Sequence, residues 1–172
     1  RKVSLYFSLF IEVALNGYSR RLIRVSTTYK FSKATFENLV KHLLDIEEGK
    51  NQLLNEYFPE PTDERRDFEK LFDDYVMKVD NLVRNASISE EQHDMFPFVT
   101  IGSRVEVEDA ESKKSYEFRI VTPYESTVEN GDISYLSPMG KSLLLKKAGE
   151  KTEVNAPGGT YCYKIKAIKH PQ

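Results

Sequence analysis

The chain has 172 residues, of which 40% are apolar and 30% are charged, and its formal net charge is -2. This composition supplies a packed core and excludes wholesale disorder, while the near-neutral charge excludes a basic nucleic-acid-binding coat over the whole chain. One cysteine, Cys162, and three dispersed histidines exclude a disulfide framework and a cysteine-rich zinc site. Residues 45–74 form an acidic block, with four Lys/Arg against eleven Asp/Glu.

Residues 1–30 differ from the rest of the chain and allow two interpretations. An apolar run interrupted by Glu12 follows two basic residues, without the small-residue cleavage site of a signal peptide. In the first interpretation, the residues before Val25 are translated upstream sequence, because Arg20 and Arg21 can be encoded by codons resembling a ribosome-binding site and Val25 by a GTG start. In the second, the segment is a β-hairpin or a short helix packed on the body.

Residues 31–86 have the pattern of two helices joined by a short break. Ser32 and Thr62 are candidate N-caps, and Pro59 and Pro61 interrupt the helical pattern between them. Apolar residues recur at three-four spacing in each arm, at Phe36, Leu39, Leu43, Ile46, Leu53 and Tyr57 and at Phe68, Phe72, Tyr75, Val79 and Leu82. This predicts an antiparallel coiled-coil hairpin with arms of about 25 residues, or about 37 Å. The charged outer faces favour a projecting rod, and a compact bundle is the alternative.

Carboxylates cluster at the break between the two helices. Glu60, Asp63 and Glu64 lie there, and such groups repel one another unless they are solvated or share a cation. Hard oxygen ligands of this kind suit Mg²⁺, which proteins bind through one or two carboxylates together with water or phosphate. The alternative is that these residues cap the second helix and keep the tip soluble.

Residues 87–98 are typical of a linker that ends in a hydrophobic anchor. Residues 99–172 then show alternating apolar positions separated by turn signals, ENGD at 129–132 and PGG at 157–159. Ser137 can cap a short helix and Pro138 can occupy its first position. The region is therefore predicted to contain several antiparallel strands and one short helix, which makes the chain an α+β protein.

The same region resembles the C-terminal domain of the bacterial Gre transcript cleavage factors, the GreA/GreB family. The resemblance is carried by IGSRV at 101–105, YEFRIV at 116–121 followed by Pro123, ENG at 129–131, ISYLSPMGKSLL at 133–144, Gly149-Glu150 and PGG at 157–159. It covers about 70 residues, and the segment 133–144 matches the family signature at every position. The order of parts agrees as well, because a coiled coil precedes this domain in the family.

The resemblance implies an FKBP-like β domain that docks on RNA polymerase and a coiled coil that enters the polymerase secondary channel. There an acidic tip stimulates cleavage of backtracked RNA, so the protein is an accessory factor and not itself an enzyme. On this chain the tip carboxylates are Glu60, Asp63 and Glu64, and Glu60 and Asp63 would hold a Mg²⁺ shared with the polymerase. The implied docking residues are Ser134, Ser137, Pro138 and Met139.

The resemblance further implies a cytoplasmic monomer with no tightly bound cofactor and no membrane partner. Such a protein contacts the RNA 3′ end and DNA only indirectly, through the elongation complex. For Ser137, Pro138 and Met139 the alternative is structural, since the first two can cap the short helix and the third can fill the core.

The tip departs from the family pattern. Cleavage factors carry Gly-Asp-x-x-Glu-Asn-x-Glu-Tyr, whereas this chain has YFPEPTDER at 57–65. The resemblance therefore implies docking on the polymerase more strongly than it implies stimulation of cleavage. The first alternative is an Rnk-like regulator that binds polymerase without stimulating cleavage. An FKBP-like prolyl isomerase or chaperone is the second, disfavoured because no aromatic-lined isomerase pocket can be traced in the sequence.

Overall fold

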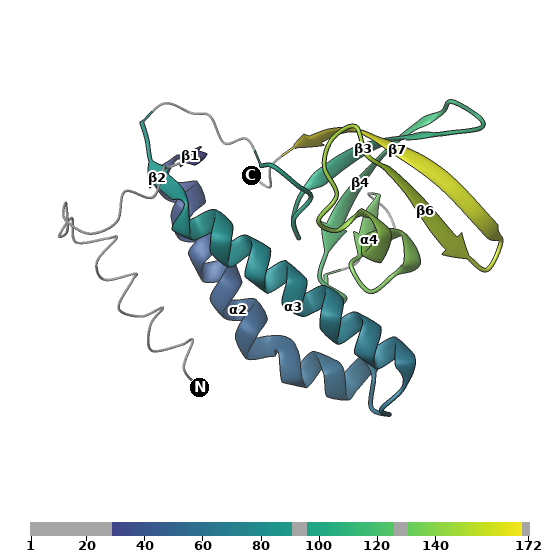
Figure 1. Cartoon of the computed structure of the whole chain (residues 1–172), viewed down its shortest axis with the longest axis horizontal. Coiled ribbons are helices and arrows are strands. Elements are labelled where there is room, and N and C mark those ends of the chain that lie inside the picture. Colours follow the sequence, from purple (N-terminus) through teal and green to yellow (C-terminus); the bar gives the residue numbers. More distant parts are fainter. Residues whose placement is uncertain (1–28, 91–95, 126–130, 170–172) are drawn as a thin grey trace.

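The computed structural model describes residues 29–90, 96–125 and 131–169. In chain order they form β1 (Tyr29–Phe31), α2 (Lys33–Tyr57), α3 (Asp63–Arg84), β2 (Ala86–Ile88), β3 (Arg104–Asp109), β4 (Ser115–Val121), β5 (Asp132–Ser134), α4 (Pro138–Leu143), β6 (Lys151–Ala156) and β7 (Gly159–Lys169). A helical hairpin is followed by a curled sheet with one short helix, which confirms the predicted fold class (Figure 1). The interpretations of residues 1–24 and of Val25, and the turn at Glu129 and Asn130, lie outside the described residues.

Side-chain caps determine where both long helices begin. Ser32 Oγ accepts a hydrogen bond from the N–H of Thr35 at 3.1 Å, and Thr62 Oγ1 accepts one from the N–H of Arg65 at 3.2 Å. These bonds satisfy N–H groups that lack a partner in the first turn, and both predicted N-caps are confirmed. In the part of the chain that the structure describes, no helix is both long and apolar enough to cross a membrane.

The buried faces of the two helices follow the predicted seam, except that Ile46 is only half-buried and Tyr57 is exposed. α3 buries Phe68, Phe72, Tyr75, Val79 and Leu82, and α2 buries Phe36, Leu39, Leu43 and Leu53. Tyr57, predicted to lie in the seam, is 40% exposed. Because α2 ends at this residue, the chain turns and Phe58 is buried instead, stacked on Phe68 with ring centroids 5.0 Å apart.

Two short strands join the beginning and the end of the hairpin. β1 and β2 pair in parallel, with Tyr29 opposite Ala86 and Phe31 opposite Ile88. The sequence predicts a linker over residues 87–98 and does not predict this pair, since three-residue strands carry too little periodicity to recognise. Phe98 is buried, as expected for the hydrophobic anchor at the end of that segment.

The sheet of the β domain has the strand order β5-β4-β3-β7-β6. The pairs β4–β3, β3–β7 and β7–β6 are antiparallel as predicted, but β5 runs parallel to β4. The predicted antiparallel sheet is therefore confirmed except at this edge, where β5 adds a parallel pairing. The pairing is fixed by Arg119 of β4, whose guanidinium donates to both carboxylate oxygens of the buried Asp132 of β5, at 2.8 and 2.6 Å.

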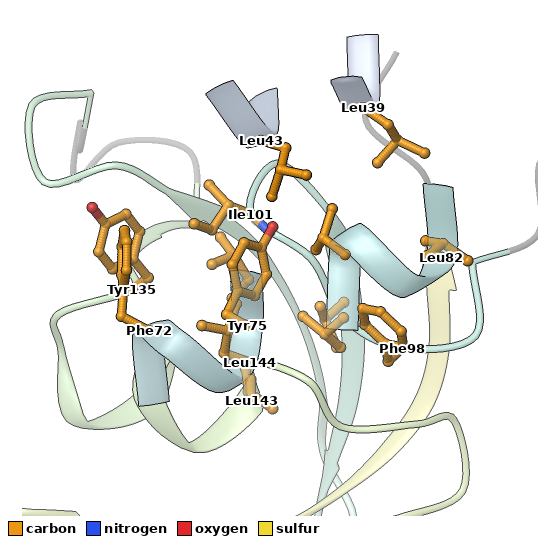
Figure 2. Close-up of a cluster of buried hydrophobic side chains, with 14 of the residues drawn as sticks. Leu39, Leu43, Phe72, Tyr75, Leu82, Phe98, Ile101, Tyr135, Leu143 and Leu144 are labelled. Carbon is orange, nitrogen blue, oxygen red and sulfur yellow. The ribbon is translucent and has the colours of Figure 1, made fainter. Parts of the chain in front are cut away.

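The hairpin lies against the β domain, so the prediction of a projecting rod is wrong. In Figure 1, α3 lies between α2 and the β domain. The buried side chains of both parts form one cluster, in which Phe72 and Tyr75 of α3 join Ile101, Tyr135 and Leu144 of the β domain (Figure 2). The physical reason is that the aromatic face of α3 is wider than one helix seam, so it covers α2 on one flank and the β domain on the other.

The hydroxyl of Tyr75 joins three segments of the chain. It accepts a hydrogen bond from the buried N–H of Ile101 at 3.1 Å, and it lies 2.7 Å from Nε2 of His42 on α2. With a neutral imidazole this contact is one hydrogen bond, in which the hydroxyl or the ring nitrogen donates according to the histidine tautomer. The hydroxyl oxygen of Tyr75 thus links α3 by hydrogen bonds to α2 and to the loop before β3.

We expect Tyr75→Phe to lower the free energy of unfolding by about 1–3 kcal/mol, because the buried N–H of Ile101 loses its acceptor. Urea denaturation of the full chain measures this change. Tyr124→Phe is the matched control, because Tyr124 is 58% exposed and water replaces its hydroxyl partner. A loss in Tyr75→Phe no larger than that in the control would show that the hydroxyl of Tyr75 does not support the joint.

Candidate functional site

The segment predicted to dock on a partner, residues 134–139, is held in a compact turn by its own hydrogen bonds. Ser137 Oγ donates to the carbonyl of Ser134 at 2.7 Å and accepts from the N–H of Gly140 at 3.0 Å. Pro138 is the exposed first residue of α4, and Met139 packs against the core. The structural roles of Ser137 as N-cap and Pro138 as first residue are confirmed. Docking by these residues stays a prediction.

The predicted tip carboxylates all lie on the surface at the turn between α2 and α3. Asp63 forms an ion pair with Arg66 within α3, and Glu64 forms one with Lys141 of α4 at 3.2 Å. Within the described ranges, no ion pair of Glu60 is found. Asp63 and Glu64 occupy the first turn of α3, where negative charge favours the helix, so the capping alternative accounts for their position.

The tip does not form a metal site by itself. Residues 29–90, 96–125 and 131–169 contain no group of three or more His, Cys, Asp or Glu side chains that could hold a metal ion. Arg66 and Lys141 already neutralise two of the three tip carboxylates. A Mg²⁺ bound here would need to displace these cations and take further ligands from another molecule.

Lys141 connects the tip to the β domain. Its ammonium, besides pairing with Glu64, lies 5.3 Å from the ring centroid of Phe58 and 5.9 Å from that of Phe68. Both distances are within the range of a cation–π interaction. Tyr135, from the loop before α4, stacks on Phe68 with centroids 6.2 Å apart and an interplanar angle of 6°.

A second contact to the tip comes from Tyr124, just after β4. Its hydroxyl donates to Glu56 Oε2 at 2.9 Å, and its ring meets the edge of Tyr57 at a centroid distance of 6.0 Å. The hydrogen bond to this carboxylate raises the pKa of the Tyr124 hydroxyl. Tyr124 and Lys141 are not among the site residues predicted from the sequence, because no local pattern links them to a tip about 70 residues away.

A cavity of about 490 Å³ separates α2 from the end of β4. Its walls include His42 and Gly49 of α2, Phe72 of α3, and Ile120 and Tyr135 of the β domain. The cavity is therefore formed between the hairpin and the β domain and is not a pocket of the β domain alone.

Burial lowers the pKa of the cavity residue His42 from 6.5 to about 4, against the opposing charge of Asp45. The imidazole is therefore neutral at neutral pH. The neutral ring forms the hydrogen bond with the Tyr75 hydroxyl.

Comparison with known proteins agrees with the resemblance seen in the sequence. The profile of the family "Transcription elongation factor, GreA/GreB, C-term" matches residues 93–170. Transcription elongation factor GreA of Clostridium acetobutylicum is 35% identical over 107 residues, which cover 62% of this chain and 68% of that protein. GreA of Clostridioides difficile is 36% identical over 107 residues, which cover 62% of this chain and 67% of that protein.

Solved structures of related proteins were also found. GreA/GreB from Nitrosomonas europaea is 21% identical with a TM-score of 0.45, and the match covers 83% of this chain and 100% of that one. Thermus aquaticus Gfh1 is 24% identical with a TM-score of 0.40, and the match covers 84% and 99%. The identity to GreA over two thirds of its length shows that this chain belongs to the GreA/GreB family of transcription elongation factors.

Proposed function

We propose that this chain binds RNA polymerase in the cytoplasm, enters the secondary channel with its helical hairpin and stimulates cleavage of backtracked RNA. The observation that carries the proposal is the family membership combined with an acidic turn at the end of a helical hairpin, placed before the family domain in the chain. The protein would be an accessory factor, and the bond-breaking chemistry would belong to the polymerase.

In this proposal the tip adds carboxylates to a site of the polymerase. Glu60 and Asp63 would contribute oxygens to a Mg²⁺ whose other ligands come from the polymerase, with Glu64 beside them. Such an ion activates water and stabilises charge that develops on phosphate. The exposure of all three side chains supports the proposal, because a carboxylate that shares a metal with another molecule has to be accessible.

A second candidate function is regulation without cleavage, as in an Rnk-like protein that binds the polymerase and blocks or competes with cleavage factors. It is favoured by the pairing of Asp63 with Arg66 and of Glu64 with Lys141. These pairs occupy two of the carboxylates that cleavage would need free. Both candidates share the same docking partner.

RNA cleavage in a stalled, backtracked elongation complex separates the two candidates. At fixed Mg²⁺ we expect the chain to increase cleavage, and Glu60→Ala with Asp63→Ala to reduce that stimulation by about 10- to 100-fold or more, since loss of the outer-shell partners of a metal site already costs that much. Glu153→Ala, an exposed carboxylate on β6, is the control and should keep full stimulation. Unchanged cleavage in the double variant would contradict the tip assignment.

Absence of cleavage, together with displacement of a labelled authentic GreA from the polymerase, would establish the regulator instead. Absence of both would contradict polymerase binding as the function of this chain.

A further inference from the structure

The cavity between α2 and the end of β4 has the size and composition of a small-molecule site. Its volume of about 490 Å³ is within the range of ligand pockets, roughly 300–1,000 Å³. Three parts of the fold contribute apolar or aromatic walls, with Leu39 and Leu53 from α2, Phe72 from α3, and Ile120 and Tyr135 from the β domain. Ligand sites combine such a lining with a small number of polar groups that fix the orientation of the bound molecule.

The hydroxyl of Tyr135 is one such polar group. Tyr135 is 5% exposed, and its ring packs against Phe68 and Phe72 with centroids 6.2 and 6.5 Å away. In Figure 2 its oxygen lies at the margin of the buried cluster. Within residues 29–90, 96–125 and 131–169 no group forms a hydrogen bond with this oxygen. Buried polar groups in folded proteins nearly always have a partner, so the Tyr135 hydroxyl is available to a molecule in the cavity.

His42 contributes a second polar atom to the wall. Its Nε2 is hydrogen-bonded to the Tyr75 hydroxyl, whereas its Nδ1 has no hydrogen-bond partner in the described part of the chain. Burial lowers the pKa of this imidazole to about 4, so the ring is neutral and adds no positive charge to the cavity. Nδ1 donates or accepts a hydrogen bond according to the tautomer.

The charged groups of the wall favour a positively charged ligand. Among the described residues that line the cavity, the charged side chains are Asp45, Arg119 and Glu125. The guanidinium of Arg119 donates to both carboxylate oxygens of Asp132, at 2.8 and 2.6 Å, so this cation is already neutralised. Asp45 and Glu125 form no ion pair with any residue that the structure describes. Their two negative charges disfavour a phosphate or a carboxylate ligand and attract an amine.

We propose that this cavity binds a small organic cation in which an aromatic ring carries an alkylamine. The ring lies between the apolar and aromatic walls, next to Phe72 and Ile120, and the ammonium points to Asp45 and Glu125 at the exposed margin. Carboxylates and aromatic faces are the groups that attract such cations. The hydroxyl of Tyr135 fixes the orientation of the ring. This inference goes beyond the proposed function and does not depend on polymerase binding.

Calorimetric titration of the full chain with two indole compounds tests the charge preference. Tryptamine and indole-3-propionate share the ring and the two-carbon chain, which ends in an ammonium in the first and in a carboxylate in the second. We expect tryptamine to bind with a dissociation constant below about 1 mM and indole-3-propionate to bind at least about tenfold more weakly. Equal binding of the two compounds, or no binding of tryptamine, would overturn the proposal.

Removal of the two carboxylates tests which groups hold the ammonium. Asp45→Asn with Glu125→Gln should weaken tryptamine binding at least about tenfold and abolish the preference over indole-3-propionate. The control is Glu48→Gln with Glu153→Gln, because both of these carboxylates are exposed and neither belongs to the cavity wall. If the two double variants bind tryptamine equally well, Asp45 and Glu125 do not hold the ammonium and the proposal is wrong.

Gly49→Phe tests the location of the ligand. Gly49 lines the cavity, and a Cβ on it meets nothing within 4 Å, so a phenyl ring extends into open space. Phenylalanine is also a better helix former than glycine, so the chain should keep its helical circular dichroism. We expect Gly49→Phe to weaken tryptamine binding at least about tenfold, because the ring takes the space of the ligand. Binding equal to that of the parent would place tryptamine outside the cavity and contradict the proposal.

Tyr135→Phe tests the role of the hydroxyl. Because no described group is bonded to this hydroxyl, its loss should leave the thermal midpoint of unfolding unchanged. Tryptamine binding should weaken about three- to tenfold, since one hydrogen bond to the ligand is lost. A lower midpoint with unchanged tryptamine binding would show that the hydroxyl serves the fold and not the ligand. All of these measurements use the free chain, so their outcomes are independent of whether it binds RNA polymerase.

Discussion

Gly140→Ala is expected to lower the free energy of unfolding by about 3 kcal/mol or more, or to prevent folding of the β domain altogether. A Cβ at this position would lie 2.1 Å from the carbonyl oxygen of Ser134 and 2.8 Å from Cα of Tyr135. Both are backbone atoms, and Ser134 cannot move away without breaking its bonds to Ser137. Urea denaturation followed by circular dichroism measures the loss.

The matched control for this variant is Gly49→Ala in the middle of α2. A Cβ there would meet nothing within 4 Å, so the substitution adds helix propensity without a clash. We expect Gly49→Ala to raise the free energy of unfolding by about 0.5–1 kcal/mol. Changes of the same sign in both variants would show that the close approach at Gly140 is not what destabilises the chain.

Acid should destabilise the chain through His42. Its pKa falls from 6.5 to about 4 on folding, so between these values the unfolded chain binds more protons than the folded one. Stability from this group is therefore fully present above pH 6.5 and is lost as the pH falls toward 4, by roughly 2–3 kcal/mol. Protonation also places a positive charge on the ring that is hydrogen-bonded to the buried Tyr75 hydroxyl.

The measurement is the free energy of unfolding at several pH values from 7 to 4, in the parent chain and in His42→Gln. A glutamine carbonyl can accept the Tyr75 hydroxyl hydrogen but does not titrate. Other groups contribute to the pH dependence of both proteins, so the difference between the two curves isolates His42. Parallel curves would contradict the buried, neutral histidine.

Features encoded by neighbouring residues could be predicted from the sequence. Ser32, Thr62 and Ser137 are caps because a hydroxyl and the N–H groups it serves lie within three residues of one another. The seam of α3 is equally local, since a period of three to four residues places its apolar side chains on one face.

Contacts between distant residues could not be predicted in the same way. Lys141 meets Glu64 across 77 residues and Tyr124 meets Glu56 across 68, and neither pair leaves a periodic trace in the sequence. The sequence of the two helices suggests a projecting rod, because their apolar seam is narrow and their other faces are charged. It does not reveal that the aromatic side chains of α3 also pack against the β domain. The parallel edge at β5 was missed for a similar reason, as it depends on the distant pairing of Arg119 with Asp132.

The bridge from Tyr75 to His42 and Ile101 also bears on modularity. A hairpin taken from a relative and grafted onto this β domain would need a hydroxyl at the position that Tyr75 occupies in α3. Without it, the N–H of Ile101 would be buried without an acceptor. Exchange of parts between family members is thus constrained at the middle of α3, well away from the tip and from α4. A hairpin and a β domain from different family members can therefore be combined only if together they keep the hydrogen bond between the residues at positions 75 and 101.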